Sequence, residues 1–87
     1  MMELKDTIDL MNSEHYENRF LVEYRQTKIR YERLHRIIIK YHAGTLDFKP
    51  KCDIGILEEQ AAAMGRYLKI LEIRGQKEAI DVYEGMS

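Results

Sequence analysis

Between residues 25 and 42 the chain carries the residue types that bind phosphate. This stretch has six lysines and arginines against a single acid, Glu32; they are Arg25, Lys28, Arg30, Arg33, Arg36 and Lys40. Tyr24, Tyr31 and Tyr41 lie among or beside them. Guanidinium groups bind phosphate oxygens in a bidentate manner, and a tyrosine ring offers a flat face on which a base can stack. The pattern therefore predicts a site for a nucleotide or another phosphorylated ligand.

The second half of the chain offers further groups of the same kind. Arg66, Lys69 and Arg74 can face the same pocket, and the ring of Tyr67 lies next to Arg66 in the sequence. The candidate ligand-binding residues are Arg33, Arg36, Lys40, Arg25, Lys28, Tyr24, Tyr31, Tyr67 and Arg66.

A purely structural interpretation of these residues competes with the ligand site. Basic residues beside an apolar seam are often only the solvated face of a helix, and Tyr24 and Tyr31 lie within the seam itself. Arg33, Arg36 and Lys40 are the strongest candidates, because they share one helix face with no acid between them.

The residues needed for catalysis or metal binding do not occur in a suitable arrangement. Cys52 has no histidine near it in sequence, and the adjacent Glu58 and Glu59 point to different parts of a helix. The five glycines are scattered, which excludes a phosphate-cradling loop. The three histidines are too far apart to form a short ligand pair. We expect a binding protein that has no enzymatic activity, no metal and no cofactor.

Composition points to a cytoplasmic protein that needs a partner subunit. The formal charge of −1 gives no overall attraction to nucleic acid or to an anionic membrane, and no apolar run approaches the roughly 20 residues that span a bilayer. The first eleven residues include three acids, unlike a secretory signal. With 87 residues and one cysteine, a disulfide cannot supplement the small core, so oligomerisation is expected to do so.

Periodicity predicts two helices joined by a short loop. An amphipathic lead-in over residues 1–12 precedes a helix over about 14–42, whose seam is spaced alternately by four and three: Phe20, Tyr24, Thr27, Tyr31, Leu34, Ile38 and Tyr41. Gly44 ends this helix, and residues 44–53 form the loop. Cys52 or Asp53 caps a second helix over about 54–79. The hairpin is expected to occupy residues 13–80. The pattern is lost after Gly75, so fraying and a tail over 81–87 are expected.

The second helix carries two parallel lines of mostly apolar residues. One line is Leu57, Ala61, Met64, Leu68 and Leu71; the other is Ile56, Gln60, Ala63, Tyr67 and Ile70. A helix that faces one neighbour needs one such stripe, so two stripes predict a second neighbour. The expected fold is an all-α antiparallel two-helix hairpin that assembles as a homo-oligomeric helical bundle.

Three segments resemble a family of small proteins from tailed phages and prophages, including crAss-like phages. They are EYRQTKIRYERLH, AGTLDF and EEQAAAMGRYLKILEIR, within a resemblance that covers about residues 12–75. The two-helix layout is also similar to the hairpin domain of phage sponge proteins that defeat CBASS and Thoeris immunity. Those proteins form oligomers, commonly hexamers, and hold cyclic oligonucleotides or cyclic ADP-ribose signals between subunits. No binding residue of the sponges is carried over to this chain.

This resemblance implies a phage counter-defence sponge in the host bacterial cytoplasm. It further implies homo-oligomers, hexamers where they follow the sponge pattern, that hold a cyclic nucleotide in pockets between subunits. An alternative hypothesis is a small phage protein that binds and inhibits, or scaffolds, a host or phage protein through an exposed apolar helix face. Nucleic-acid binding is a weaker hypothesis, because acids elsewhere in the chain cancel the basic stretch.

Overall fold

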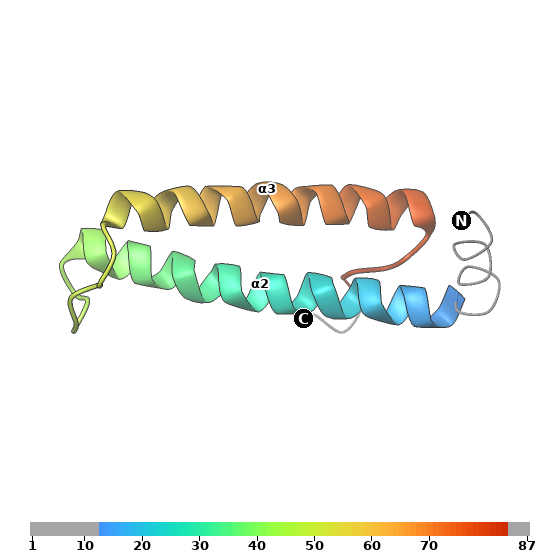
Figure 1. Ribbon diagram of the computed structural model, residues 1–87, viewed down its shortest axis with the longest axis horizontal. Coiled ribbons are helices and arrows are strands. Elements are labelled where there is room, and N and C mark those ends of the chain that lie inside the picture. Colours follow the sequence, from blue (N-terminus) through green and yellow to red (C-terminus); the bar gives the residue numbers. More distant parts are fainter. Residues whose placement is uncertain (1–12, 84–87) are drawn as a thin grey trace.

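Two long helices form where apolar residues recur at intervals of three and four. In the computed structural model, α2 spans Ser13–Ala43 and α3 spans Ile54–Glu78, and the two pack side by side in opposite directions (Figure 1). The structure describes residues 13–83, so the predicted lead-in over residues 1–12 and the end of the tail lie outside the described residues. The predicted all-α, two-helix hairpin is confirmed, whereas its assembly into a homo-oligomer stays a prediction.

Short-range hydrogen bonds fix both ends of the loop between the helices. Gly44 has a φ of 79°, and the N–H groups of Gly44 and Thr45 donate to the carbonyls of Tyr41 and Lys40. This is the Schellman arrangement, which a glycine adopts at low cost. At the start of α3, Asp53 is the N-cap, and its carboxylate accepts from the N–H of Gly55 at 2.9 Å.

The hairpin buries one line of each helix. On α2, Phe20, Tyr24, Thr27 and Ile38 are buried, while Tyr41, at the loop end of the predicted seam, is 43% exposed. On α3, the line that contains Leu68 and Leu71 faces α2, and the line that contains Ile56 and Ile70 remains exposed. The two stripes predicted from the sequence therefore have different environments within a single chain: one is covered and one is open.

The chain beyond Gly75 does not fray, which corrects the expectation from the sequence. α3 continues to Glu78, Ala79 adopts the left-handed conformation with a φ of 59°, and the N–H of Ile80 donates to the carbonyl of Gly75 at 2.8 Å. The chain then runs from the end of α3 back towards α2 (Figure 1). Ile80 is 5% exposed and Val82 is fully buried, so both belong to the core together with Phe20, Tyr24, Leu68 and Leu71.

Gly75 is needed where this returning segment crosses α3. A Cβ at this position would lie 2.8 Å from the carbonyl oxygen of Ile80 and 3.2 Å from a methyl group of Val82. Real Cβ atoms do not approach a backbone oxygen that closely. The absence of a side chain at Gly75 therefore allows the tail to reach the core.

We predict that Gly75→Ala lowers the free energy of unfolding by about 1–3 kcal/mol, although alanine favours a helix by about 1 kcal/mol. The added methyl group pushes the returning segment outward and exposes Val82. Urea denaturation followed by circular dichroism measures the change.

Ala79→Gly is the matched opposite substitution, since it relieves the left-handed strain at the end of the same helix. It should stabilise the protein by about 0.5–1 kcal/mol. A stabilised Gly75→Ala variant would contradict the proposed crossing.

Candidate functional site

A groove with two arginines runs between the helices, on one side of the hairpin. It has a volume of about 190 Å³ and is lined by Arg30, Arg33, Leu34 and Ile37 of α2 and by Gln60 and Met64 of α3. Arg30 and Arg33 are exposed, whereas Leu34, Ile37 and Met64 are half-buried. The groove therefore combines two cations, one carboxamide and an apolar floor.

The two arginines of the groove are available to an anion. Neither forms an ion pair with a described acid; Arg30 makes only a long hydrogen bond, 3.5 Å, to the hydroxyl of Thr27. A guanidinium that is not paired with a carboxylate can bind phosphate oxygens in a bidentate manner. The apolar floor and Gln60 can contact an uncharged part of the same ligand, but at about 190 Å³ the groove is smaller than the roughly 300–1,000 Å³ of usual ligand pockets, so it encloses only part of a nucleotide-sized molecule.

The basic surface continues from the groove onto the outer face of α2. Arg36 and Lys40 follow Arg33 at intervals of three and four residues, and all three side chains are exposed. Residues at this spacing are neighbours on a helix surface. The cluster of Arg33, Arg36 and Lys40 predicted from the sequence is therefore contiguous, and Arg33 joins it to the groove.

The structure places Arg25, Lys28 and Arg66 away from the groove. Lys28 lies 3.9 Å from Glu32 on another side of α2, and Arg25 is half-buried. Arg66 follows Gln60 by six residues, so it points about 120° away from the groove around the axis of α3. None of these three residues lines the groove that contains Arg33.

The three candidate tyrosines have different surroundings. Tyr24 is 1% exposed in the core and donates to Glu72 at 2.8 Å, so its ring has no face for a ligand within one chain. Tyr31 is half-buried and lies beside Gly65, where an added Cβ would meet the ring at an ordinary contact distance of 3.5 Å. Tyr67 is 41% exposed and remains accessible.

Tyrosine–glutamate hydrogen bonds link the two helices. Tyr67 of α3 donates to Glu23 of α2 at 3.0 Å, and Tyr24 of α2 donates to Glu72 of α3. Near the open end of the hairpin Tyr16 donates to Glu78. Each carboxylate raises the pKa of the tyrosine that donates to it; for Tyr24 the larger cause is burial.

Arg74 has a structural role at this end of the hairpin. Its guanidinium donates to Glu78 at 3.2 Å and to the hydroxyl of Tyr16 at 2.7 Å, and it lies 5.0 Å above the ring of Phe20. Arg74, which the sequence predicted could face the ligand pocket, is engaged in these structural contacts instead.

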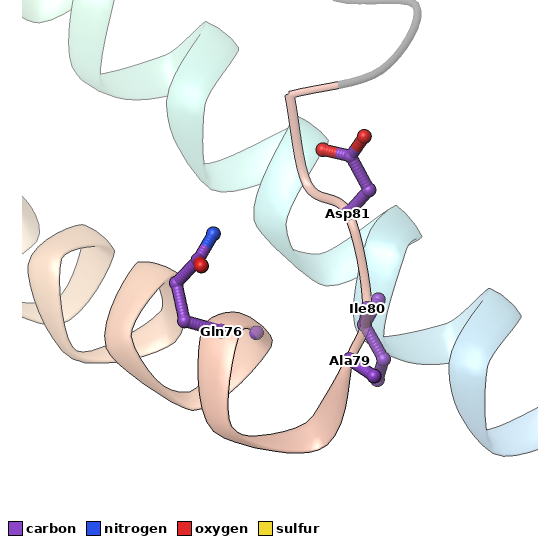
Figure 2. Close-up of a pocket in the computed structure, with 5 residues that line it drawn as sticks. Gln76, Ala79, Ile80 and Asp81 are labelled. Carbon is purple, nitrogen blue, oxygen red and sulfur yellow. The ribbon is translucent and has the colours of Figure 1, made fainter.

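A larger hollow lies beside the crossing of the tail, but its chemistry differs. It has a volume of about 330 Å³ and is lined by Gly75, Gln76, Ala79, Ile80 and Asp81. Figure 2 shows the amide of Gln76 and the carboxylate of Asp81 on either side of it. Because its one charged lining residue is an acid, this hollow does not suit a phosphorylated ligand.

Residues 13–83 contain neither a membrane-spanning helix nor a cluster of metal ligands. No helix in this part of the chain is long and apolar enough to cross a bilayer. No group of three or more histidine, cysteine, aspartate or glutamate side chains is arranged to hold a metal ion there.

Sequence reasoning missed Arg30, Gln60 and Met64 as parts of one groove. Arg30 precedes Ile37 by seven residues and Arg33 by three, a spacing that places these side chains on adjoining parts of one helix face. That signal was available. The pairing of this face with Gln60 was not, because it depends on how the two helices are aligned along each other.

Comparison with known proteins gives one family. The model of the family described as Sequestin matches residues 14–77, which include both helices and the whole groove. No curated protein and no solved structure matches the chain.

We predict that Tyr24 gives the stability of the fold a specific alkaline pH dependence. Burial and the carboxylate of Glu72 raise its pKa above the ordinary value of 10.0, so the folded chain keeps a proton that the unfolded chain loses. This contribution is complete below about pH 10 and is lost as the pH rises through the folded pKa.

Tyr24→Phe should cost about 1 kcal/mol at neutral pH and should flatten the fall in stability above about pH 10. Urea titrations at a series of pH values measure both effects. Tyr41→Phe, which removes a hydroxyl from an exposed ring, is the control. Parallel pH profiles for the wild type and Tyr24→Phe would show that the hydroxyl has no such role.

Proposed function

This chain belongs to the Sequestin family, and we propose that it sequesters a cyclic nucleotide immune signal, as an anti-CBASS or anti-Thoeris sponge of phage origin. The family's name indicates a sequestering protein. In this proposal the protein acts in the host bacterial cytoplasm, as a homo-oligomer with pockets between subunits.

The observation that carries the proposal is the groove with two arginines that form no ion pair with an acid of residues 13–83. In a chain with a net charge of −1, most such cations are expected to lie near acids. Here Arg30 and Arg33 meet at the junction of the two helices, and Arg36 and Lys40 extend the same positive surface. Clustered cations of this kind favour a ligand with more than one phosphate, as cyclic oligonucleotides and cyclic ADP-ribose have.

The groove favours binding over catalysis. It contains no serine, cysteine, histidine or carboxylate, and so no nucleophile or general base among its lining residues. A ligand held there keeps its bonds. We therefore propose that the protein lowers the free concentration of the signal and does not degrade it.

Calorimetric titration with a panel of cyclic dinucleotides, cyclic trinucleotides and cyclic ADP-ribose isomers tests the proposal. We expect one member of the panel to bind, and the bound ligand to be recovered unchanged by chromatography after heat release. If no member of the panel binds, the proposal is wrong. Recovery of a cleaved product would show that the protein is an enzyme.

Arg30→Gln and Arg33→Gln should each weaken this binding roughly tenfold or more, since each removes a charge-assisted contact to phosphate. Arg19→Gln is the matched control, because Arg19 is an exposed arginine of the same helix about 16 Å along its axis from Arg30. Equal affinities for all three variants would place the ligand elsewhere.

The exposed line of α3 supports a second candidate function, binding of a host or phage protein. Ile56, Ile70 and Ile73 are each about half exposed, which is unusual for isoleucines on one helix. Co-purification of a stoichiometric protein partner, without any bound small molecule, would favour this function over the sponge.

A further inference from the structure

The exposed line of α3 has a regular composition along its length. Ile56, Ala63 and Ile70 follow one another at intervals of seven residues and lie outside the hairpin core, with both isoleucines 51% exposed. Seven residues are close to two helical turns, so these positions form a straight stripe along the helix. Ala63, at the centre of the stripe, has only a methyl group and permits a close approach of another helix.

Oppositely charged residues flank this stripe on one side. Glu59 and Arg66 are exposed, and neither side chain has a hydrogen bond or an ion pair with another described residue. Gln60 and Tyr67 flank the stripe on the other side, towards the groove, where Gln60 is a lining residue. The stripe therefore has one charged edge and one edge shared with the candidate ligand site.

We infer that a second copy of this chain packs on the stripe, with its α3 antiparallel to the first and the two helices crossing at Ala63. In this register Ile56 faces Ile70 of the second copy, and Ile70 faces Ile56. Glu59 lies four residues before Ala63 and Arg66 three residues after it, so each Glu59 meets Arg66 of the other copy. All four charges are paired by the symmetry.

The charges of Glu59 and Arg66 favour the antiparallel orientation over a parallel one. A symmetric parallel pair would place the charged edge of each helix against the edge with Gln60 and Tyr67 of the other, and Glu59 and Arg66 would have no oppositely charged partner. The antiparallel pair also aligns the two helix dipoles favourably. A second copy is therefore a better occupant of the stripe than an unrelated apolar helix, which would leave Glu59 and Arg66 without partners.

The same register gives the second copy a part in the groove. On the edge opposite the charges, Tyr67 of the second copy comes to lie against Gln60, which lines the groove beside Arg30 and Arg33. Its ring is 41% exposed, and its hydroxyl is held by Glu23 of its own chain. This ring supplies an aromatic face that the groove of a single chain lacks. The assignment of the ring to a ligand rests on the proposed function; the packing itself does not.

Analytical ultracentrifugation of purified full-length charge variants tests the packing. The wild type should form a dimer, and Glu59→Arg and Arg66→Glu should each raise its dissociation constant roughly tenfold, because each variant places like charges at two symmetric positions. The double variant exchanges the charges and should restore the wild-type value. Lys69→Glu, on an exposed part of α3 away from the stripe, is the control.

Three results would overturn the inference: a wild-type chain that stays monomeric at millimolar concentration, single variants that behave like the control, or a double variant that does not recover. Ala63→Arg against Ala62→Arg gives an independent check. Both alanines are exposed, so neither change disturbs the hairpin core, but only the first puts two guanidinium groups together at the crossing point.

Calorimetry on the Ala63→Arg variant separates this inference from the proposed function. A dimer that Ala63→Arg dissociates, in a protein that binds no cyclic nucleotide, would leave the packing standing and remove the sponge. A cyclic nucleotide that binds equally well to a monomeric wild type and to Ala63→Arg would support the sponge and contradict the packing of a second copy.

Discussion

A hairpin of two helices has only one interface, and most of this structure follows from that limit. Each helix can bury only the arc that faces the other. On α3 this arc holds Leu68 and Leu71, and a second apolar line with Ile56 and Ile70 remains open. The returning tail adds Ile80 and Val82 to the core, but it covers the end of the hairpin away from the loop. The fold of a single chain therefore leaves this second apolar line of α3 exposed to solvent.

The polar residues of the hairpin explain why a chain with no net positive charge has a basic groove. Glu23, Glu72 and Glu78 accept hydrogen bonds from tyrosines, and Glu78 also pairs with Arg74. These contacts hold three of the fifteen acidic residues at the rim of the helix interface. Among the described residues, no acid pairs with the cations of the groove or with Arg36 and Lys40 on the outer face of α2. Local charge, which the overall composition hides, is what makes a phosphorylated ligand plausible on physical grounds.

Sequence periodicity predicted the hairpin because both helices have long apolar repeats, a cap at Gly44 and a cap at Asp53. It failed at residues 76–82, where the chain turns at an alanine in the left-handed conformation, a position at which glycine is the usual signal. Ile80 and Val82 alternate for too short a distance to show a period. For the site, the cluster of Arg33, Arg36 and Lys40 could be read from helix spacing, but the groove could not, because it depends on the alignment of α3 along α2.

The position of Gln60 connects the two open features of the molecule. It lines the groove, and it also borders the stripe on which we place the second copy. If association brings Tyr67 of that copy to the groove, ligand binding and association become thermodynamically linked. A ligand that contacts both chains stabilises the dimer by as much as the dimer strengthens its binding. At low protein concentration and without ligand, the chain would then be largely monomeric with open grooves. A rising concentration of a ligand that contacts both chains would fill the grooves and assemble the dimer. For a sequestering protein, this linkage makes binding tightest where the ligand is abundant.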